Sequence, residues 1–308
     1  MLPKAQRAAL TGGRRGVGPL IPPLTESQRP LRQQVFELIR AAGLIPRVQL
    51  AKDLGVSPAS VTTLSSELIE AGLIEEVAAP RENDAGRGRP AVALGVRAQA
   101  HRVAGMKLSD REHTAVIVDF AGKLIADESI PRRPGPMSLP EILETIETLL
   151  ARVCTKAGVD RDALSAVGIG LPGFVDCAEG IVFWSSILAE RSVPIAAAAS
   201  ARLGLPVYVD NDANLVALAE LWFGAGRSLS DFAVVTIEHG VGMGFVMNHR
   251  IYRGAQRLGM ELGHTKVQLD GALCRCGQRG CLEAYVADYA LAREATTALN
   301  WGHKESQP

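Results

Sequence analysis

The pattern of apolar and polar positions after residue 30 predicts three short helices joined by tight turns. The apolar residues of the first helix lie on one helical face and are Leu31, Val35, Leu38 and Ile39. Gly43 ends this helix, and a second is expected between Pro46 and Gly55, because proline is tolerated at a first helical position. The third begins at Ser57, a capping residue followed by proline, and ends near Gly72.

The outward positions of the third helix are small and hydroxylated, which lets a first helical turn enter the major groove of DNA without a clash. We expect DNA contacts from Ser57, Ala59, Ser60, Thr62 and Thr63. Residues 73–96 then predict a strand, a Gly-rich polar tip and a second strand, which together form a β-hairpin wing. Arg87 and Arg89 at that tip are expected to reach phosphates or a narrow minor groove. The alternative is a three-helix bundle for protein contacts, but the Arg-rich hairpin favours nucleic acid.

From residue 102 onward, short apolar runs alternate with turns and predict an α/β region. Strands are expected at 103–108, 114–119 and 124–130, and a helix at about 139–157. The apolar run AVGIG predicts a buried strand that continues into LPGFVD, and LPVYV predicts another that ends at Asp210. A sheet whose strands are connected by crossover helices indicates the α/β class.

Asp210, Asn211 and Asp212 follow that strand directly and precede an amphipathic helix closed by Gly224. Polar groups at the carboxyl end of such a strand face a cleft, so they form a candidate site. Asn211 or Asp212 could equally serve only as a helix cap, but three consecutive polar groups exceed what one cap needs. The glycines of GVGMG, residues 240–244, could let backbone amides approach an anion or could form only a tight turn.

Composition adds an uneven charge distribution to this picture. The 308-residue chain is 47% hydrophobic with zero formal net charge, which describes an ordinary globular protein of two domains. Residues 1–97 carry 13 Lys and Arg against 9 Asp and Glu, so the basic excess lies in the part with the predicted helices. Residues 1–30 are rich in Gly, Pro and Arg and predict a flexible arm. Because no apolar run has the length of a membrane span or signal peptide, we expect a cytoplasmic protein without a membrane partner.

The cysteines are concentrated near the C-terminal end, where Cys274, Cys276 and Cys281 lie within eight residues. A total of five, expected in a reducing compartment, argues against a disulfide framework. Their polar, turn-prone setting is unlike a core, which favours metal ligands over buried thiols. Structural zinc takes four N or S ligands, and His264, ten residues upstream, is the natural fourth. A site filled by four protein ligands leaves no position for a catalytic water, so this zinc is expected to be structural.

Together these motifs resemble the ROK family of repressors and sugar kinases. In chain order they are LPGFVD at 171–176, VDNDAN at 209–214, ELWFGAG at 220–226, GVGMG at 240–244, ELGH at 261–264 and CRCGQRGCLE at 274–283. The resemblance implies a winged helix–turn–helix at 31–97 and an actin-like (ribonuclease H-like), two-lobed, ATPase-type sugar-binding domain at 98–308. The fold class would combine α+β and α/β parts, with lobes at 98–224 and 225–308, and the protein would form a homodimer or a dimer of dimers.

The same resemblance implies particular site residues. It assigns zinc to the four residues named above and sugar hydroxyls to Asn211, Asp212, Glu261, His264 and Glu283. In a kinase, Asp212 would be the catalytic base. Family kinases carry Asp-x-Gly-Gly-Thr-Lys after the first strand, whereas this chain has KLSDRE at 107–112. The side chains of Ser109 and Asp110 and the charge of Glu112 are unfavourable next to phosphate, which argues against binding of ATP and magnesium.

The sequence therefore predicts a sugar-responsive transcriptional repressor of carbohydrate genes, with operator DNA and a sugar or sugar phosphate as partners. The alternative is an ATP-dependent hexose or N-acetylhexosamine kinase, and a third possibility is a binding module that no longer signals. After Cys281 the sequence has 27 residues, enough for one helix and a polar tail. Family members continue with further elements that hold adenine, so the second lobe is expected to be incomplete, whether in a truncated or frame-shifted chain or in a shortened sensor.

Overall fold

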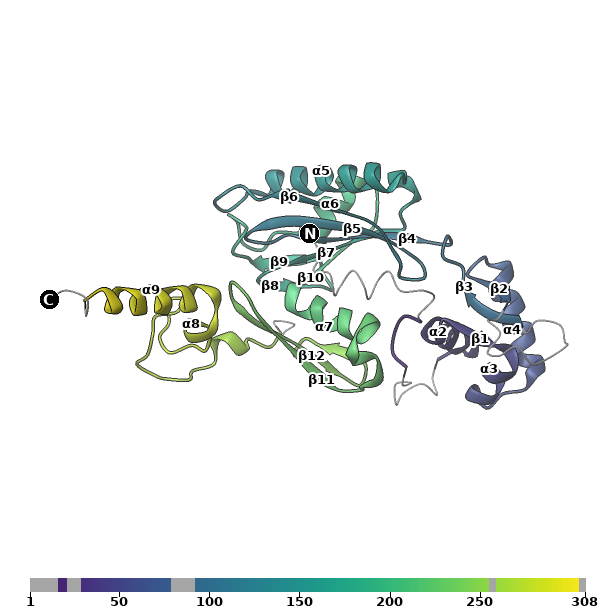
Figure 1. The fold of residues 1–308 in the computed structure, drawn as a ribbon. Coiled ribbons are helices and arrows are strands. Elements are labelled where there is room, and N and C mark those ends of the chain that lie inside the picture. Colours follow the sequence, from purple (N-terminus) through teal and green to yellow (C-terminus); the bar gives the residue numbers. More distant parts are fainter. Residues whose placement is uncertain (1–15, 21–28, 79–91, 255–258, 305–308) are drawn as a thin grey trace.

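The computed structural model describes residues 16–20, 29–78, 92–254 and 259–304. Arg87 and Arg89, at the tip of the expected wing, lie outside these residues. Figure 1 shows a small helical unit at one end, a twisted sheet under two helices in the middle, and the last helix at the other end.

The helical unit combines three helices and three strands over residues 31–78 and 92–96. They are α2 (Leu31–Ala42), β1 (Leu44–Pro46), α3 (Arg47–Leu54), α4 (Pro58–Glu70), β2 (Ile74–Ala78) and β3 (Val92–Val96), with strand order β1-β3-β2. The three predicted helices are confirmed, although Pro46 precedes the second helix instead of beginning it. Ser57 caps α4 as predicted, because its hydroxyl accepts a hydrogen bond from the Ser60 amide at 3.1 Å. Val35, Ile39 and Val61 are fully buried in the core of this unit.

The central sheet has five strands within residues 92–254, in the order β10-β7-β4-β5-β6. They are β4 (Arg102–Lys107), β5 (Glu112–Asp119), β6 (Leu124–Pro131), β7 (Ala166–Leu171) and β10 (Val207–Asn211). The predicted strands and the predicted crossover helix are confirmed, since β4, β7 and β10 pair in parallel. Helices α5 (Leu139–Ala157) and α6 (Ile195–Leu203) pack on one face of this sheet (Figure 1). A hairpin of β8 (Phe174–Asp176) and β9 (Ile181–Trp184) and the short helix η2 (Arg161–Ala163) complete this part.

Helix α7 (Asp212–Phe223) lies between the central sheet and an antiparallel sheet over residues 232–252 (Figure 1). That second sheet consists of β11 (Phe232–Ile237), β12 (Val241–Met247) and β13 (Arg250–Tyr252). The glycines of β12 explain the close fit. A Cβ added at Gly242 would lie 2.9 Å from the Cβ of Ala213, and one at Gly244 would lie 2.5 Å from the Ala213 carbonyl oxygen. These two glycines therefore let β12 pack directly on α7, a role different from the anion contact or tight turn expected from the sequence.

Residues 16–20, which we call the strap, fall within the predicted flexible arm over residues 1–30 but form specific contacts. The amides of Val17, Gly18 and Leu20 donate hydrogen bonds to carbonyls of residues 40, 222 and 227 at 2.7–2.8 Å. Val17 is 8% exposed. The Gly- and Pro-rich composition suggested mobility, but these five residues hold a defined conformation because partners from distant parts of the chain surround them.

The remaining elements are η3 (Ala225–Ser228), η4 (Leu262–His264), α8 (Glu283–Val286) and α9 (Asp288–Lys304). Two helices, the short α8 and the longer α9, follow Cys281, where the sequence predicted one helix and a polar tail. In Figure 1, α9 points away from the rest of the molecule. Its side chains from Leu291 to Leu299 are all exposed. Among the described residues, no helix combines the length and apolarity needed to cross a membrane.

Candidate metal centre and ligand site

The polar residues at the end of β10 divide into a cap and a candidate ligand group. The Asn211 side-chain oxygen accepts hydrogen bonds from the amides of Ala213 and Asn214 at 2.9 and 3.2 Å, so it caps α7. Its amide nitrogen donates to the Gly173 carbonyl at 3.0 Å. Asp212 is half-buried in the first turn of α7. Burial raises the pKa of Asp212, and the Lys107 ammonium group opposes that rise.

Asp210 serves a different purpose, which the sequence did not reveal. It is 6% exposed and forms an ion pair with Arg253, whose Nε lies 3.1 Å from the carboxylate. Asn214 and the Asn211 amide donate to the other carboxylate oxygen at 3.2 and 2.8 Å. The buried carboxylate of Asp210 is therefore compensated by a cation and by two N–H donors. The ion pair also links β10 to the chain that follows β13. Arg253 is 43 residues away in sequence, so no local pattern connects it to Asp210.

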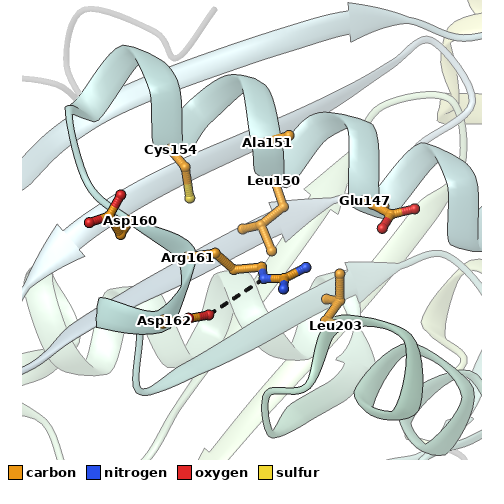
Figure 2. A pocket seen from close by; sticks show the side chains of 8 residues that line it. All are labelled: Glu147, Leu150, Ala151, Cys154, Asp160, Arg161, Asp162 and Leu203. Atoms are coloured by element: carbon orange, nitrogen blue, oxygen red, sulfur yellow. Dashed lines mark ion pairs between the residues drawn. The ribbon is translucent and has the colours of Figure 1, made fainter.

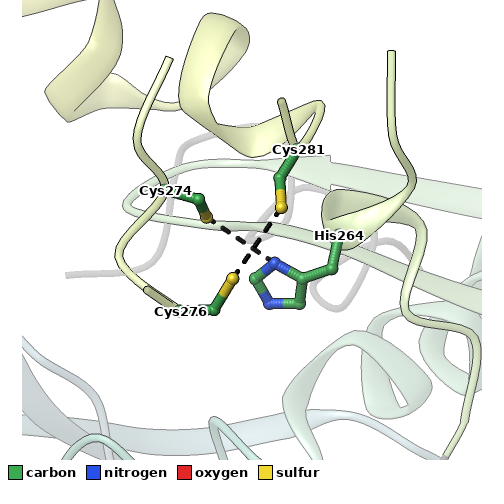
Figure 3. A group of neighbouring side chains, drawn as sticks. All are labelled: His264, Cys274, Cys276 and Cys281. Carbon is green, nitrogen blue, oxygen red and sulfur yellow. Dashed lines mark hydrogen bonds between the residues drawn. The ribbon is translucent and has the colours of Figure 1, made fainter. Parts of the chain in front are cut away.

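The structure brings the four predicted metal ligands together (Figure 3). The ligand atoms of His264, Cys274, Cys276 and Cys281 all lie within 4.8 Å of one another. Cys274 Sγ is 3.7 Å from His264 Nδ1, and Cys276 Sγ is 3.7 Å from Cys281 Sγ. A tetrahedron around zinc with bonds of about 2.3 Å places its ligands about 3.8 Å apart, so these two separations match a tetrahedral zinc site.

Tight turns shape this cluster. The Gly277 amide donates to the Cys274 carbonyl at 3.0 Å, and the Cys274 amide donates to the Gln278 carbonyl at 2.8 Å. Gly277 has a φ of +85°, which a residue with a side chain rarely adopts. At Gly280 a Cβ would lie 1.6 Å from the Gln268 carbonyl oxygen. The glycines between the cysteines are therefore required for the sulfur atoms to converge.

The surroundings of the cluster favour thiolate at one of its cysteines. Lys266 Nζ lies 3.2 Å from Cys281 Sγ, and although burial opposes the shift, this contact helps to lower the pKa of Cys281 to about 7. Burial raises the pKa of Cys274 to about 11. A metal cation would deprotonate both thiols, because zinc binds the thiolate form.

The two remaining residues of the predicted sugar site, Glu261 and Glu283, lie beside β12. Glu283 is 8% exposed, and its carboxylate accepts a hydrogen bond from the Val241 amide at 3.2 Å. Its other oxygen lies 3.6 Å from Cys274 Sγ. Glu261 Oε2 lies 3.9 Å from His264 Nε2, the ring nitrogen that faces away from the sulfur atoms. Burial raises the pKa of Glu261, His264 lowers it, and Glu283 adds to the rise.

Strand β12 connects the two groups of candidate residues. One side of its first half contacts α7 at Ala213, next to Asn211 and Asp212. Its edge pairs with Met260 through Met243, and Gly263 packs against the Val241 carbonyl. The metal cluster and the α7 N-terminus therefore both border the first few residues of one strand.

Residues 104–307 match the sequence profile of the ROK family. The chain belongs to the ROK family. It is 31% identical over 273 residues to the DNA-binding transcriptional repressor Mlc of Escherichia coli, which covers 86% of this chain and 65% of Mlc.

Two solved ROK structures resemble the fold. A ROK transcriptional regulator, a homologue of Mlc from E. coli, has a TM-score of 0.72 at 28% identity and covers 90% of this chain and 68% of its own. A ROK glucokinase from Streptomyces griseus, solved with glucose and AMPPNP, has a TM-score of 0.59 at 32% identity and covers 66% and 62%. The chain spans just under two thirds of the length of the curated relatives it matches, with values of 64%, 65% and 63% for the first three.

The ROK family includes kinases, so the loop at residues 107–112 is of interest. Lys107 forms an ion pair with Glu238 at 3.4 Å, and Arg111 forms one with Asp288 at the start of α9. The Ser109 hydroxyl donates to the Glu112 carbonyl at 2.7 Å. The loop therefore contacts the turn between β11 and β12 and the start of α9. Lys107, whose charge also acts on Asp212, is a site residue that the sequence interpretation passed over.

A separate hollow of about 530 Å³ lies between α5, η2 and α6 (Figure 2). Its described lining residues are Glu147, Leu150, Ala151, Cys154, Asp160, Arg161, Asp162 and Leu203. Figure 2 shows Arg161 turned toward Asp162, with which it forms an ion pair at 3.8 Å. None of these residues belongs to the metal cluster or to the candidate ligand residues described above. The candidate site is therefore defined by the side chains around β12 and not by this hollow.

Proposed function

We propose that the protein is a sugar-responsive transcriptional repressor of carbohydrate metabolism genes. The extent of similarity carries this proposal, because the regulator structure aligns with 90% of the chain and the glucokinase with 66%. The family profile begins at residue 104, so an alignment over 90% must include much of the helical unit. A helical unit in front of a ligand site is what a regulator needs and a sugar kinase does not.

Residues 31–97 would act as a winged helix–turn–helix, with α4 as the recognition helix. Ser57, Ala59, Thr62 and Thr63 are exposed on α4, and Ser60 is half-buried. The hydroxyls of Thr62 and Thr63 donate to carbonyls one turn earlier, at 2.9 and 3.2 Å. Such local hydrogen bonds can be exchanged for contacts with base edges or phosphates at little cost. Arg87 and Arg89 remain predicted DNA contacts, and a homodimer would present two such units to one operator.

The second part of the proposal concerns the sugar. Residues 98–308 would form an actin-like domain that reads sugar hydroxyls through Asn211, Asp212, Glu261, His264 and Glu283. Paired carboxylates suit this task, because an epimer that moves one hydroxyl leaves a buried acceptor without its hydrogen bond. Either a neutral sugar or a sugar phosphate remains a candidate effector.

Zinc would act as a structural ion in this site. His264, Cys274, Cys276 and Cys281 would hold it, and the ion would fix η4 and the start of α8, which carry His264 and Glu283. With His264 Nδ1 directed to the metal, Nε2 faces Glu261. A hydrogen bond from Nε2 to the sugar would therefore form beside the Glu261 carboxylate and would link metal and sugar.

An ATP-dependent hexose or N-acetylhexosamine kinase is the second candidate. The half-buried Asp212 favours it, since a carboxylate with a raised pKa suits the catalytic base of a phosphoryl transfer to a sugar hydroxyl. Release of ADP from ATP in the presence of glucose or N-acetylglucosamine would support this function. Loss of that release in Asp212→Asn would assign the base.

The deciding experiment for the repressor is fluorescence anisotropy with DNA from upstream of the coding region, at fixed salt. The additions are xylose, glucose and N-acetylglucosamine, with and without a 6-phosphate where the sugar allows one. Specific binding that one sugar changes would support the proposal and identify the effector class. Sugar binding by calorimetry without any DNA binding would contradict it and direct attention to the kinase assay.

A further inference from the structure

The strap lies between the helical unit and the far end of α7. On one side, the Val17 amide donates to the Arg40 carbonyl of α2 at 2.8 Å. On the other, the Gly18 amide donates to the Trp222 carbonyl at 2.8 Å, and the Leu20 amide donates to the Arg227 carbonyl at 2.7 Å. Three backbone hydrogen bonds from this short segment therefore connect two units that are far apart in sequence.

Two arginines reinforce this contact from opposite directions. The Arg40 guanidinium lies 4.2 Å from the centroid of the Trp222 ring, and its Nε donates to the Val17 carbonyl at 3.2 Å. Arg227 donates from Nε to the Gly18 carbonyl at 2.8 Å and from Nη2 to the Ala41 carbonyl at 2.6 Å. Each arginine thus contacts the strap and also the unit on the far side of it.

Close packing of the strap against α2 and α7 restricts their relative motion. A Cβ at Gly16 would lie 1.7 Å from the Ala41 carbonyl oxygen, and Gly18 has a φ of +97°. At Gly122, in the turn between β5 and β6, a Cβ would lie 2.8 Å from both Val17 and Phe223. The strap therefore moves with α2 and with the C-terminal end of α7, or the contact breaks.

Helix α7 extends from this contact to the ligand site. Its first turn carries Asp212 and is capped by Asn211, and its last residues are Trp222 and Phe223. Twelve helical residues span about 18 Å, and a helix of this length moves as a rigid body. A ligand that displaces the first turn therefore displaces Trp222, and the Arg40 and Arg227 contacts carry that displacement to α2.

We propose that α7 and the strap, fastened by Arg40 and Arg227, form the route by which an occupied ligand site changes the DNA affinity of the helical unit. This inference rests on the proposed function, because it names the route of regulation for the same site. The effect requires that the sugar binds two arrangements of α7 with different affinity.

The test compares Arg227→Met and Arg40→Met with a matched control, Arg202→Met. Arg202 also donates two hydrogen bonds, to Glu147 at 2.9 and 2.7 Å, but lies on α6, outside the strap contact. The readout is the ratio of operator Kd with and without the active sugar, together with sugar affinity by calorimetry. We expect Arg227→Met and Arg40→Met to bind the sugar with a Kd within about twofold of the wild-type value. In both variants, the change in operator Kd that the sugar causes should be reduced by at least about two thirds relative to the wild-type protein.

Folding of each variant is checked by its thermal unfolding midpoint, and two independent arginines keep the test decisive if one variant fails to fold. A wild-type ratio in both folded variants would overturn the route and leave the repressor proposal intact. Absence of any sugar effect in the wild-type protein would contradict both proposals. A loss of the effect in Arg202→Met as large as in the strap variants would also overturn the route, because the effect would not depend on the strap.

Discussion

Removal of a single sulfur atom tests the metal cluster. Cys276→Ala should reduce bound zinc from about one ion per chain to a small fraction, because three remaining ligands hold the ion far more weakly than four. Cys276 is the exposed cysteine of the cluster, so its loss costs little packing. Zinc is measured by inductively coupled plasma mass spectrometry after passage over a chelating resin.

Cys177→Ala is the matched control, since Cys177 is a free cysteine outside the cluster. It should retain the wild-type zinc content. An equal zinc content in Cys276→Ala would show that this cysteine is no ligand.

The buried ion pair of Asp210 gives a second prediction at this scale. Arg253→Met should lower the free energy of unfolding by about 3 kcal/mol, because it leaves a buried carboxylate without its cation. Arg202→Met, which removes an exposed pair with Glu147, should cost less than about 1 kcal/mol. Urea unfolding of both variants at pH 7 measures the difference. Similar small losses for the two would mean that water solvates Asp210 in place of Arg253.

Individual residues differ in how far the sequence reveals them. The clustering of the four candidate metal ligands was predictable, because three cysteines and a histidine within 18 residues have few other uses in a polar, turn-prone segment. Asn211 caps α7, which was one of its two alternatives, and its contact with a ligand stays a prediction. Arg253 and Lys107 were missed, because their partners are distant in sequence and a single basic residue after a strand has no distinctive pattern.

At the scale of elements, we expect the stability of the protein to be sensitive to substitutions in the contact between β12 and α7. Gly242→Ala should lower the free energy of unfolding by about 1–3 kcal/mol, because its Cβ would lie 2.9 Å from both Ala213 and Thr236. The control is Gly168→Ala in β7, where an added Cβ meets nothing within 4 Å. That variant should change stability by less than about 1 kcal/mol in either direction. Equal effects in urea unfolding would mean that β12 can move away from α7.

The helices and strands were largely predictable, because apolar periodicity and caps such as Ser57 and Gly43 act within a few residues. Two element-level features were not. The glycines of β12 gave a pattern compatible with an anion contact, a turn or close packing, and only the position of α7 decides among them. The strap has the composition of a mobile segment, yet its hydrogen bonds go to residues 23 to more than 200 positions away.

For the whole molecule, the salt dependence of DNA binding is the most direct expectation. Arg89→Ala should weaken operator binding and reduce the slope of log K against log salt by about one, because one fewer phosphate or groove contact releases fewer counterions. Anisotropy titrations at several salt concentrations measure the slope. Arg202→Ala changes the net charge equally and should leave the slope unchanged. An unaltered slope in Arg89→Ala would remove this residue from the DNA interface.

The contact between Gly242, Gly244 and α7 also bears on how such a protein can diverge. A larger residue at Gly242 would need smaller residues at both Ala213 and Thr236, and glycine at Ala213 would weaken the helix. A larger residue at Gly244 would meet the Ala213 carbonyl oxygen, which no substitution removes. No single substitution therefore opens this contact at low cost. The exposed first turn of α4 has no such restriction. If α4 reads the operator as proposed, that operator can change over generations while the region between strap and ligand site stays fixed. Relatives would then come to differ in their target genes before they differ in how they respond.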